Sequence, residues 1–200
     1  MSYIGTQPNN VKKNIGLYNP NEILQLEKDG NWGGSLEHIE TQTISSGSTM
    51  AFTSIKESVY DIHCLLGKNI ESSSANTSIS VRLSNDGGSS YENTNYQLAL
   101  QYIPTSGTAG TVGNSSATYM EFTSDTANNN RASCMYLYNL GNSSTSSYST
   151  FQQMETGVLS YGGSVYSPAE TINAIQVLTT NTNAWTGTVE LYGIKQLWVI

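Results

Sequence analysis

The sequence predicts an all-β protein, folded as an antiparallel β-sandwich of jelly-roll-like type and preceded by an N-terminal arm that contains a short helix. Along most of the chain, apolar and polar residues alternate with a period of two, as in strands that bury one face. Gly, Asn, Asp and Ser separate these runs at short intervals, which is typical of sandwiches and barrels. The 200 residues suit one domain with one core.

The composition is that of a folded, acidic protein. Only 12% of the residues are charged, but 13 Tyr, 3 Trp and 3 Phe supply apolar area for a core. The net charge is −7, and the eight Lys and Arg residues are scattered. Nucleic acids and anionic membranes bind basic patches, so we expect neither as a partner. The sequence has no apolar run of 18 residues and no signal-peptide pattern, so we expect no membrane insertion.

The first 34 residues are predicted to form an arm, and residues 35–200 the sandwich. Asn19 can cap a helix, Pro20 suits its first position, and Gly30 can end it. A helix of two turns is not stable alone in water, so the arm needs a surface to lie on, either its own sandwich or a neighbouring subunit. Because the arm shows little strand alternation, we expect it to dock on another subunit and not to complete the sandwich. The apolar residues predicted to make this assembly contact are Tyr3, Ile4, Ile23, Leu24 and Leu26.

Alternation predicts eleven strands. The run 60–66 turns Tyr60 and its alternate partners inward and leaves Asp61 and His63 toward solvent. After the run 78–83, Asp86 and Gly87 predict a tight hairpin to a return strand at 96–102. The other predicted strands are residues 37–43, 49–55, 118–123, 133–140, 148–155, 171–178, 187–194 and 196–200.

The same alternation predicts the core and the exposed loops. Residues 105–116 and 141–149 are rich in Gly, Ser and Thr and are predicted as loops. Cys64 and Cys134 lie in apolar runs, where they either act as small buried hydrophobes or form one disulfide. The predicted core residues are Tyr60, Ile62, Cys64, Leu66, Ile79, Val81, Leu83, Leu98, Leu100, Ile175, Val177, Val189 and Leu191.

No motif predicts catalysis, a metal site or a cofactor. His63 and Asp61 share one strand face, and His38 and Glu40 share another. Alternation alone generates such pairs, and neither HisGluXaaXaaHis nor paired CysXaaXaaCys occurs. Cys64 and His63 are neighbours in a strand and point to opposite faces, so they cannot act as a nucleophile and its base. We therefore expect no enzyme, no metal and no cofactor.

Carbohydrate binding is a separate possibility. Tyr and Trp can stack on sugar rings while Asn, Ser and Thr bond the hydroxyls, and this composition is rich in all of them. Cleavage of the sugar chain would need two carboxylates at a defined separation, and no pair is singled out by its spacing. The residues predicted to contact a glycan are Tyr91, Tyr119, Tyr161 and Trp185.

Much of the chain resembles a known class of proteins. The opening MSYIGTQP resembles the start of small tail and appendage proteins of marine tailed bacteriophages. From Leu36 onward the chain resembles a jelly-roll-like module of phage structural proteins. The segments that carry this second resemblance are LEHIETQTISSGSTMAFT (Leu36–Thr53), YDIH (Tyr60–His63), VRLSNDGGSSY (Val81–Tyr91), INAIQVL (Ile172–Leu178) and GTVELYGI (Gly187–Ile194).

The resemblance implies a non-enzymatic virion protein on the exterior of the particle, made in the cytoplasm of the host bacterium. Its implied partners are other virion proteins and further copies of itself, commonly in a trimer. The chain passes almost directly from its arm to the module, which favours a small tail-fibre adaptor or capsid-decoration subunit over a full fibre. The alternative is a receptor-recognition module that attaches the phage to a polysaccharide of the host surface.

Overall fold

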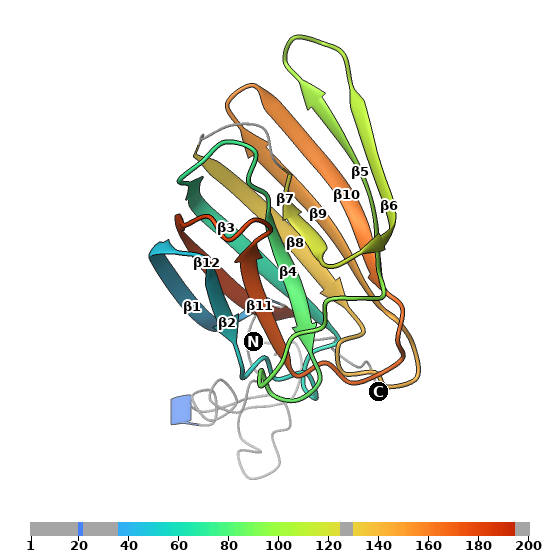
Figure 1. Ribbon diagram of the computed structural model, residues 1–200. Coiled ribbons are helices and arrows are strands. Elements are labelled where there is room, and N and C mark those ends of the chain that lie inside the picture. Colours follow the sequence, from blue (N-terminus) through green and yellow to red (C-terminus); the bar gives the residue numbers. More distant parts are fainter. Residues whose placement is uncertain (1–19, 22–35, 125–129, 195–200) are drawn as a thin grey trace, which may run out of the picture. The chain divides into compact units, whose positions relative to one another are not determined.

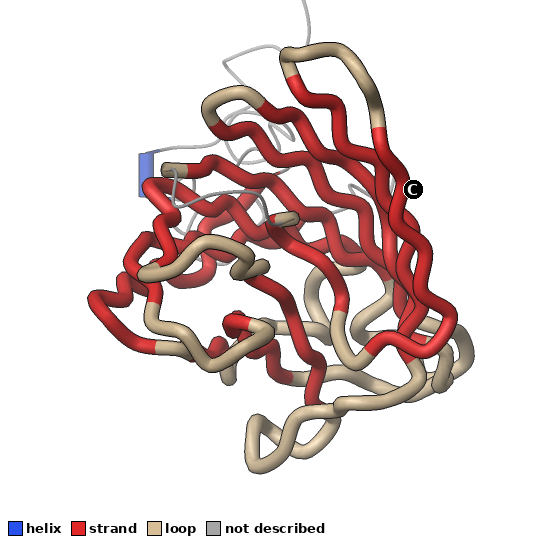
Figure 2. The backbone as a smooth tube through the Cα atoms, turned by 45° about the horizontal axis from the view of Figure 1, so that its top comes forward, coloured by secondary structure: helices blue, strands red, loops and turns tan. Residues whose placement is uncertain are grey.

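The computed structural model describes residues 20–21, 36–124 and 130–194, and the part that it describes is an all-β sandwich of two antiparallel sheets (Figure 1). Strands make up most of this body (Figure 2). The strands are β1 (Leu36–Gly47), β2 (Thr49–Phe52), β3 (Ile62–Ser72), β4 (Ile79–Ser84), β5 (Tyr96–Pro104), β6 (Gly110–Ala117), β7 (Met120–Thr123), β8 (Arg131–Tyr138), β9 (Ser147–Glu155), β10 (Val158–Tyr166), β11 (Ala174–Thr179) and β12 (Trp185–Ile194).

Some sequence-based expectations lie outside the described residues. Pro20 and Asn21 are helical, but the rest of the predicted helix falls outside that part of the chain. The same holds for the predicted last strand, 196–200, so the role of the arm stays a prediction. Within the described residues, no helix has the length and apolar character needed to cross a membrane. The predicted assembly residues outside the description are Tyr3, Ile4, Ile23, Leu24 and Leu26.

The two sheets differ in size. The larger has the strand order β1-β12-β3-β8-β9-β10-β5-β6, and the smaller has the order β2-β11-β4-β7. In Figure 1 the smaller sheet lies in front of the larger one, and the β5–β6 hairpin of the larger sheet extends beyond the smaller sheet. The larger sheet thus has an inner face, which packs on the smaller sheet, and an outer face, which no strand of the described residues covers.

Apolar side chains from both sheets fill the space between them. Leu65, Met135 and Leu137 of the larger sheet and Phe52 and Phe122 of the smaller one are fully buried. Burial of this kind is the main favourable contribution to folding. The core prediction is confirmed for the residues that join this cluster: Ile79, Val81, Leu83, Leu98, Leu100, Ile175, Val177, Val189 and Leu191.

The predicted inward face of β3 is wrong. Leu65 and His63 point into the core and are 0% exposed, whereas Ile62 and Leu66 are half-buried on the outer side. Cys64 is buried, but on the outer face, where it is paired across the strands with Tyr136 and Tyr192. Both sides of this strand carry apolar residues, so the pattern alone does not select the inner side.

A hydrogen bond lets His63 occupy a core position. Its Nε2 lies 2.8 Å from the carbonyl oxygen of Ile55, and its ring meets that of Tyr60 edge-on. Burial lowers the pKa of His63 from its ordinary value of 6.5, although the Ile55 bond and the charges of Glu57 and Asp61 oppose this shift. The imidazole is therefore held in its neutral form, because a buried charge is costly.

Ten of the predicted strands are confirmed, but two further strands were missed. The segment 110–117 was predicted as part of a loop and is strand β6, and β10 was not predicted at all. β6 is rich in Gly, Ser and Asn, and the alternation of β10 is interrupted by Gly162 and Gly163. A Cβ at Gly162 would lie 2.4 Å from the carbonyl oxygen of Ala99, so this glycine lets β5 and β10 approach.

The hairpin predicted at Asp86 is also wrong, because β4 and β5 belong to different sheets. Asp86 instead organises the loop between them. Its Oδ1 accepts hydrogen bonds from Ser84 Oγ (2.8 Å) and Ser90 N (3.0 Å), and its Oδ2 accepts one from Ser90 Oγ (2.6 Å). These bonds, with those from Ser90 foremost, lower the pKa of Asp86 to about 2.

The orientation of β3 gives the first testable prediction. Leu65→Ala should destabilise the protein by about 2 to 5 kcal/mol, because it leaves a cavity in a fully buried site. Ile62→Ala, on the half-buried outer side of the same strand, should cost clearly less. Urea unfolding followed by circular dichroism measures both losses. A larger loss for Ile62→Ala than for Leu65→Ala would mean that the strand is turned the other way.

The buried histidine gives the second prediction. Since the pKa of His63 is lower in the folded state, the unfolded chain binds more protons below pH 6.5, and stability should fall as the pH decreases from about 7 to about 5. His63→Gln should reduce this slope, while His38→Gln, at an exposed position on β1, should retain it. Melting temperatures across this range test the prediction, and an equal slope in all three proteins would contradict it.

Candidate functional site

Five neighbouring strands of the larger sheet, β8, β9, β10, β5 and β6, present no charge on the outer face. Their only charged residues are Arg131 and Glu155, which are buried and joined by an ion pair with Nε and Oε2 2.9 Å apart. At the other end of the outer face, Lys68 and Glu190 form an exposed ion pair of 2.7 Å. The uncharged half of the face has no electrostatic preference for polyanions or polycations, so a neutral ligand suits it best.

Small residues line up across four of these strands. Gly163 of β10 pairs with Thr150 of β9 on one side and with Ala99 of β5 on the other, and Ala99 pairs with Gly113 of β6. Residues paired in this way point to the same side of the sheet, and adjacent strands are about 4.8 Å apart. Gly163, Ala99 and Gly113 form the floor of a hollow of about 500 Å³, which we call the trough.

The next outward row borders the floor of the trough on one side, just outside the lining of the hollow, and we call it the first wall. Gln152, Tyr161 and Gln101 are paired side by side on β9, β10 and β5. Tyr161 is 40% exposed, and its hydroxyl donates a hydrogen bond to Gln101 Oε1, which orients the ring. This wall combines an aromatic ring with amide groups that can both donate and accept hydrogen bonds.

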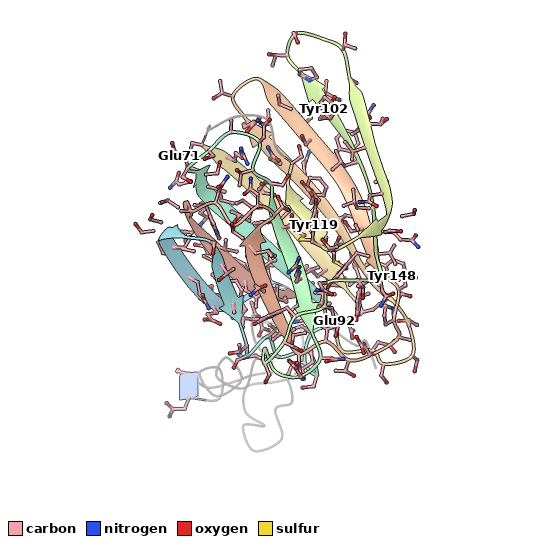
Figure 3. The ribbon with its side chains drawn as sticks, in the orientation of Figure 1. Glu71, Glu92, Tyr102, Tyr119 and Tyr148 are labelled. Carbon is pink, nitrogen blue, oxygen red and sulfur yellow. The ribbon has the colours of Figure 1, made fainter. Side chains whose placement is uncertain are left out.

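The opposite wall follows the same pattern. Tyr148, Val165 and Gln97 are paired on β9, β10 and β5, and Tyr148, labelled in Figure 3, is 44% exposed. The two walls are four residues apart along each strand, which corresponds to about 13 Å between their Cα atoms. On β8, Tyr136 continues the row of the floor beyond Thr150 and is 39% exposed.

A second, more apolar hollow of about 400 Å³ lies beside the trough on the outer face. Leu66, Cys134, Met154 and Leu159 contribute to its lining, and Met154 is the most exposed apolar side chain of the face at 64%. Cys134 and Cys64 are free thiols with their Sγ atoms 3.8 Å apart. Burial and the neighbouring thiol raise the pKa of Cys64 to about 12, so it is not a ready nucleophile.

The other side of the β5–β6 hairpin carries a smaller cleft of about 230 Å³ between the sheets. Tyr102 and Tyr119, both labelled in Figure 3, line it together with Leu98, Leu100 and Val112. The two leucines belong to the core and Tyr119 is half-buried against it. This cleft is therefore largely the open end of the core.

The four residues predicted to bind a glycan do not come together. Only Tyr161 lies beside the trough, in the outward row next to its floor. Tyr119 lines the cleft between the sheets, Tyr91 lies in the loop between β4 and β5, and Trp185 is 1% exposed inside the core. The residues that do accompany Tyr161 are Gln97, Gln101, Tyr136, Tyr148 and Gln152. Their signal in the sequence is the outward half of the alternation in β5, β8 and β9.

The two histidines do not form a shared site. His63 is enclosed in the core, whereas His38 lies on β1, with its Nε2 2.7 Å from Thr41 Oγ1 and its ring against Tyr192. Among the residues that the structure describes, no three His, Cys, Asp or Glu side chains are grouped as a metal site would require.

Comparisons with known proteins give no family. No protein-family model and no curated protein matches the chain. Among solved structures it is similar to the NanB sialidase of Streptococcus pneumoniae (TM-score 0.36, 9% identity), over 81% of this chain and 27% of that one. It is also similar to a human SPRY domain (TM-score 0.34, 13% identity), over 81% of this chain and 99% of that one. A third similar structure is scytalido-glutamic peptidase (TM-score 0.29, 15% identity), over 74% of this chain and 66% of that one. These likenesses are too weak to support any conclusion about activity.

Proposed function

We propose that this chain is a non-enzymatic structural subunit on the exterior of a bacteriophage particle, either a tail appendage or adaptor or a capsid-decoration protein. The segments that resemble phage structural proteins support this proposal because they are neighbours in space. They fall on β1, β12 and β3, which are adjacent in the larger sheet, and on β2, β11 and β4, which are adjacent in the smaller one. Matching segments that build one end of a single sandwich suit a shared module better than chance similarity.

The strand pairing supports the jelly-roll-like part of the proposal. β1 and β3 pair with β12, and β2 and β4 pair with β11, so early strands pair with late ones on both sheets. This nested pairing is the pattern that results when a long antiparallel hairpin is wrapped into two sheets, as in jelly rolls.

The burial of three titratable groups, His63, Arg131 and Glu155, supports a role without catalysis. A general base must reach its substrate, and His63 is fully buried with its Nε2 at the Ile55 carbonyl. Arg131 and Glu155 are likewise enclosed as an ion pair. We propose binding, and not bond cleavage, as the activity of the exposed surfaces.

We also propose that the chain assembles with itself, most simply as a trimer. The larger sheet ends in β1, a strand of 12 residues, and in β6, and such edges promote unwanted pairing unless a neighbour covers them. Docking of the arm through Tyr3, Ile4, Ile23, Leu24 and Leu26 on other virion proteins belongs to the same proposal.

A second candidate function is recognition of a polysaccharide on the host surface. The specific observation in its favour is the uncharged outer face with three exposed tyrosines, Tyr136, Tyr148 and Tyr161. Both functions are compatible, because a virion subunit can carry the receptor site.

The proposal is tested on particles of the phage whose genome encodes the chain. Mass spectrometry of purified particles should find it in a fixed ratio to the major capsid protein, and gold-labelled antibodies against residues 35–200 should decorate intact particles. A non-structural protein of the same phage provides the control for carry-over. Detection only in the soluble lysate, at the level of that control, would contradict a structural role.

Deletion of residues 1–34 tests the role of the arm. The truncated chain should retain its β-rich circular dichroism spectrum and cooperative melting, because every described strand lies in residues 36–194. It should no longer join particles when it replaces the full chain during infection. A truncated chain that fails to fold, or that joins particles normally, would show that the arm has another role.

A further inference from the structure

We propose that the trough is a binding site for a neutral carbohydrate chain, which lies across strands β9, β10, β5 and β6. This inference deepens the proposed function by naming the class of partner, and it rests on that function only in requiring that the outer face be exposed on the particle. The residues that carry it are Tyr161 and Tyr148 on the walls, the glutamines beside them, and the floor of Gly163, Ala99 and Gly113.

The register gives the trough its shape. Along β10 the outward sequence is Tyr161, Gly163, Val165, and along β5 it is Gln101, Ala99, Gln97, so a small residue lies between two larger ones on both strands. The hollow therefore runs perpendicular to the strands and continues toward the edge at β6, where Gly113 has open space above its Cα. An extended chain of rings can lie along such a groove and leave at the open edge.

The chemistry of the lining selects the ligand class. Gly163 and Ala99 lie in strands that are paired on both sides, so their backbone groups are engaged within the sheet, and the side-chain amides of Gln97, Gln101 and Gln152 are available for directional hydrogen bonds. Exposed aromatic rings beside them offer apolar faces. Sugars match both features, since each ring combines apolar C–H faces with hydroxyls that donate and accept.

The absence of charge distinguishes the favoured ligand from others. The strands of the trough hold no charged group other than the buried Arg131–Glu155 pair of β8 and β9. Acidic polysaccharides and nucleic acids would leave their charges unpaired there, and a charged peptide would do the same. Neutral glycans involve no such cost.

Two matched pairs of variants test the site. Gly113→Phe should fill the trough, and the new Cβ meets no atom within 4 Å. Val112→Phe places the same ring on the opposite side of β6, where the valine lines the inner cleft. Tyr161→Ala removes a wall of the trough, and Tyr192→Ala removes a tyrosine from the outer face of β12, outside it. Melting temperatures establish that each variant is folded.

The full chain and these variants are applied to an array of neutral and acidic bacterial oligosaccharides, and affinities for the bound glycans are measured by calorimetry. We expect the full chain to bind neutral glycans. The affinity should fall by about tenfold or more in Gly113→Phe and Tyr161→Ala, and it should be retained in Val112→Phe and Tyr192→Ala. Affinity should be the same at low and high salt, because no charges are paired.

Several outcomes would overturn the inference. One is no binding to any neutral glycan at millimolar concentration, and another is binding that survives both trough variants. A preference for acidic glycans that weakens with salt would place the site elsewhere. Loss of glycan binding in Tyr91→Ala alone would place the site in the loop after β4. A change of molar mass in Gly113→Phe without glycan binding would assign the trough to a second copy of the chain. The particle experiment is independent of all these results, so the two proposals can fail separately.

Discussion

The packing of a four-stranded sheet on one face of an eight-stranded sheet is the constraint on which the rest of the structure depends. It decides which half of every alternating strand is buried, since a strand has only two sides. Phe52, Phe122 and Ile175 from the smaller sheet meet Leu65 and Leu191 from the larger one, and all are fully buried. The inner side is therefore determined by packing, and the opposite side is left free to vary in chemistry.

The outer face shows what that freedom produces. At the β1–β12–β3 end it carries the exposed Lys68–Glu190 ion pair, as an ordinary solvated surface does. At the β5–β6–β10 end the side chains are uncharged, and glycines and alanine stand where larger residues would fit. Since Gly113 has no neighbour above its Cα, its lack of a side chain is not required for packing within the described body. A small residue there instead keeps the trough open.

Much of the fold could be predicted from alternation, but the errors have physical causes. β4, β5, β11 and β12 each have one strongly apolar side, so their buried faces could be identified. β3 has apolar residues on both sides, and the His63–Ile55 hydrogen bond that satisfies the buried histidine is a contact that no local pattern reveals. β10 was missed because it contains Gly162 and Gly163, and glycine has a low strand propensity. Gly162 is nevertheless required there, because a side chain at this position would collide with β5.

The candidate site could be predicted only in part, because it depends on register between strands that are distant in sequence. Tyr161 was identified as a glycan-binding candidate, but its partners Gln101 and Gln152 could not be placed beside it without the pairing of β10 with β5 and β9. Tyr91, Tyr119 and Trp185 are aromatic like Tyr161, but they lie elsewhere in the fold.

Chemical-shift mapping tests the central claim, that the inner face is structural and the uncharged outer face binds. Isotope-labelled protein would be titrated with neutral oligosaccharides released from the surface polysaccharide of the host bacterium. The account predicts that shifts concentrate on the outward residues of β5, β6, β9 and β10, including the ring of Tyr161 and the side-chain amide of Gln101. Shifts centred on the β1–β12–β3 end, on the loops, or nowhere at millimolar ligand would contradict it.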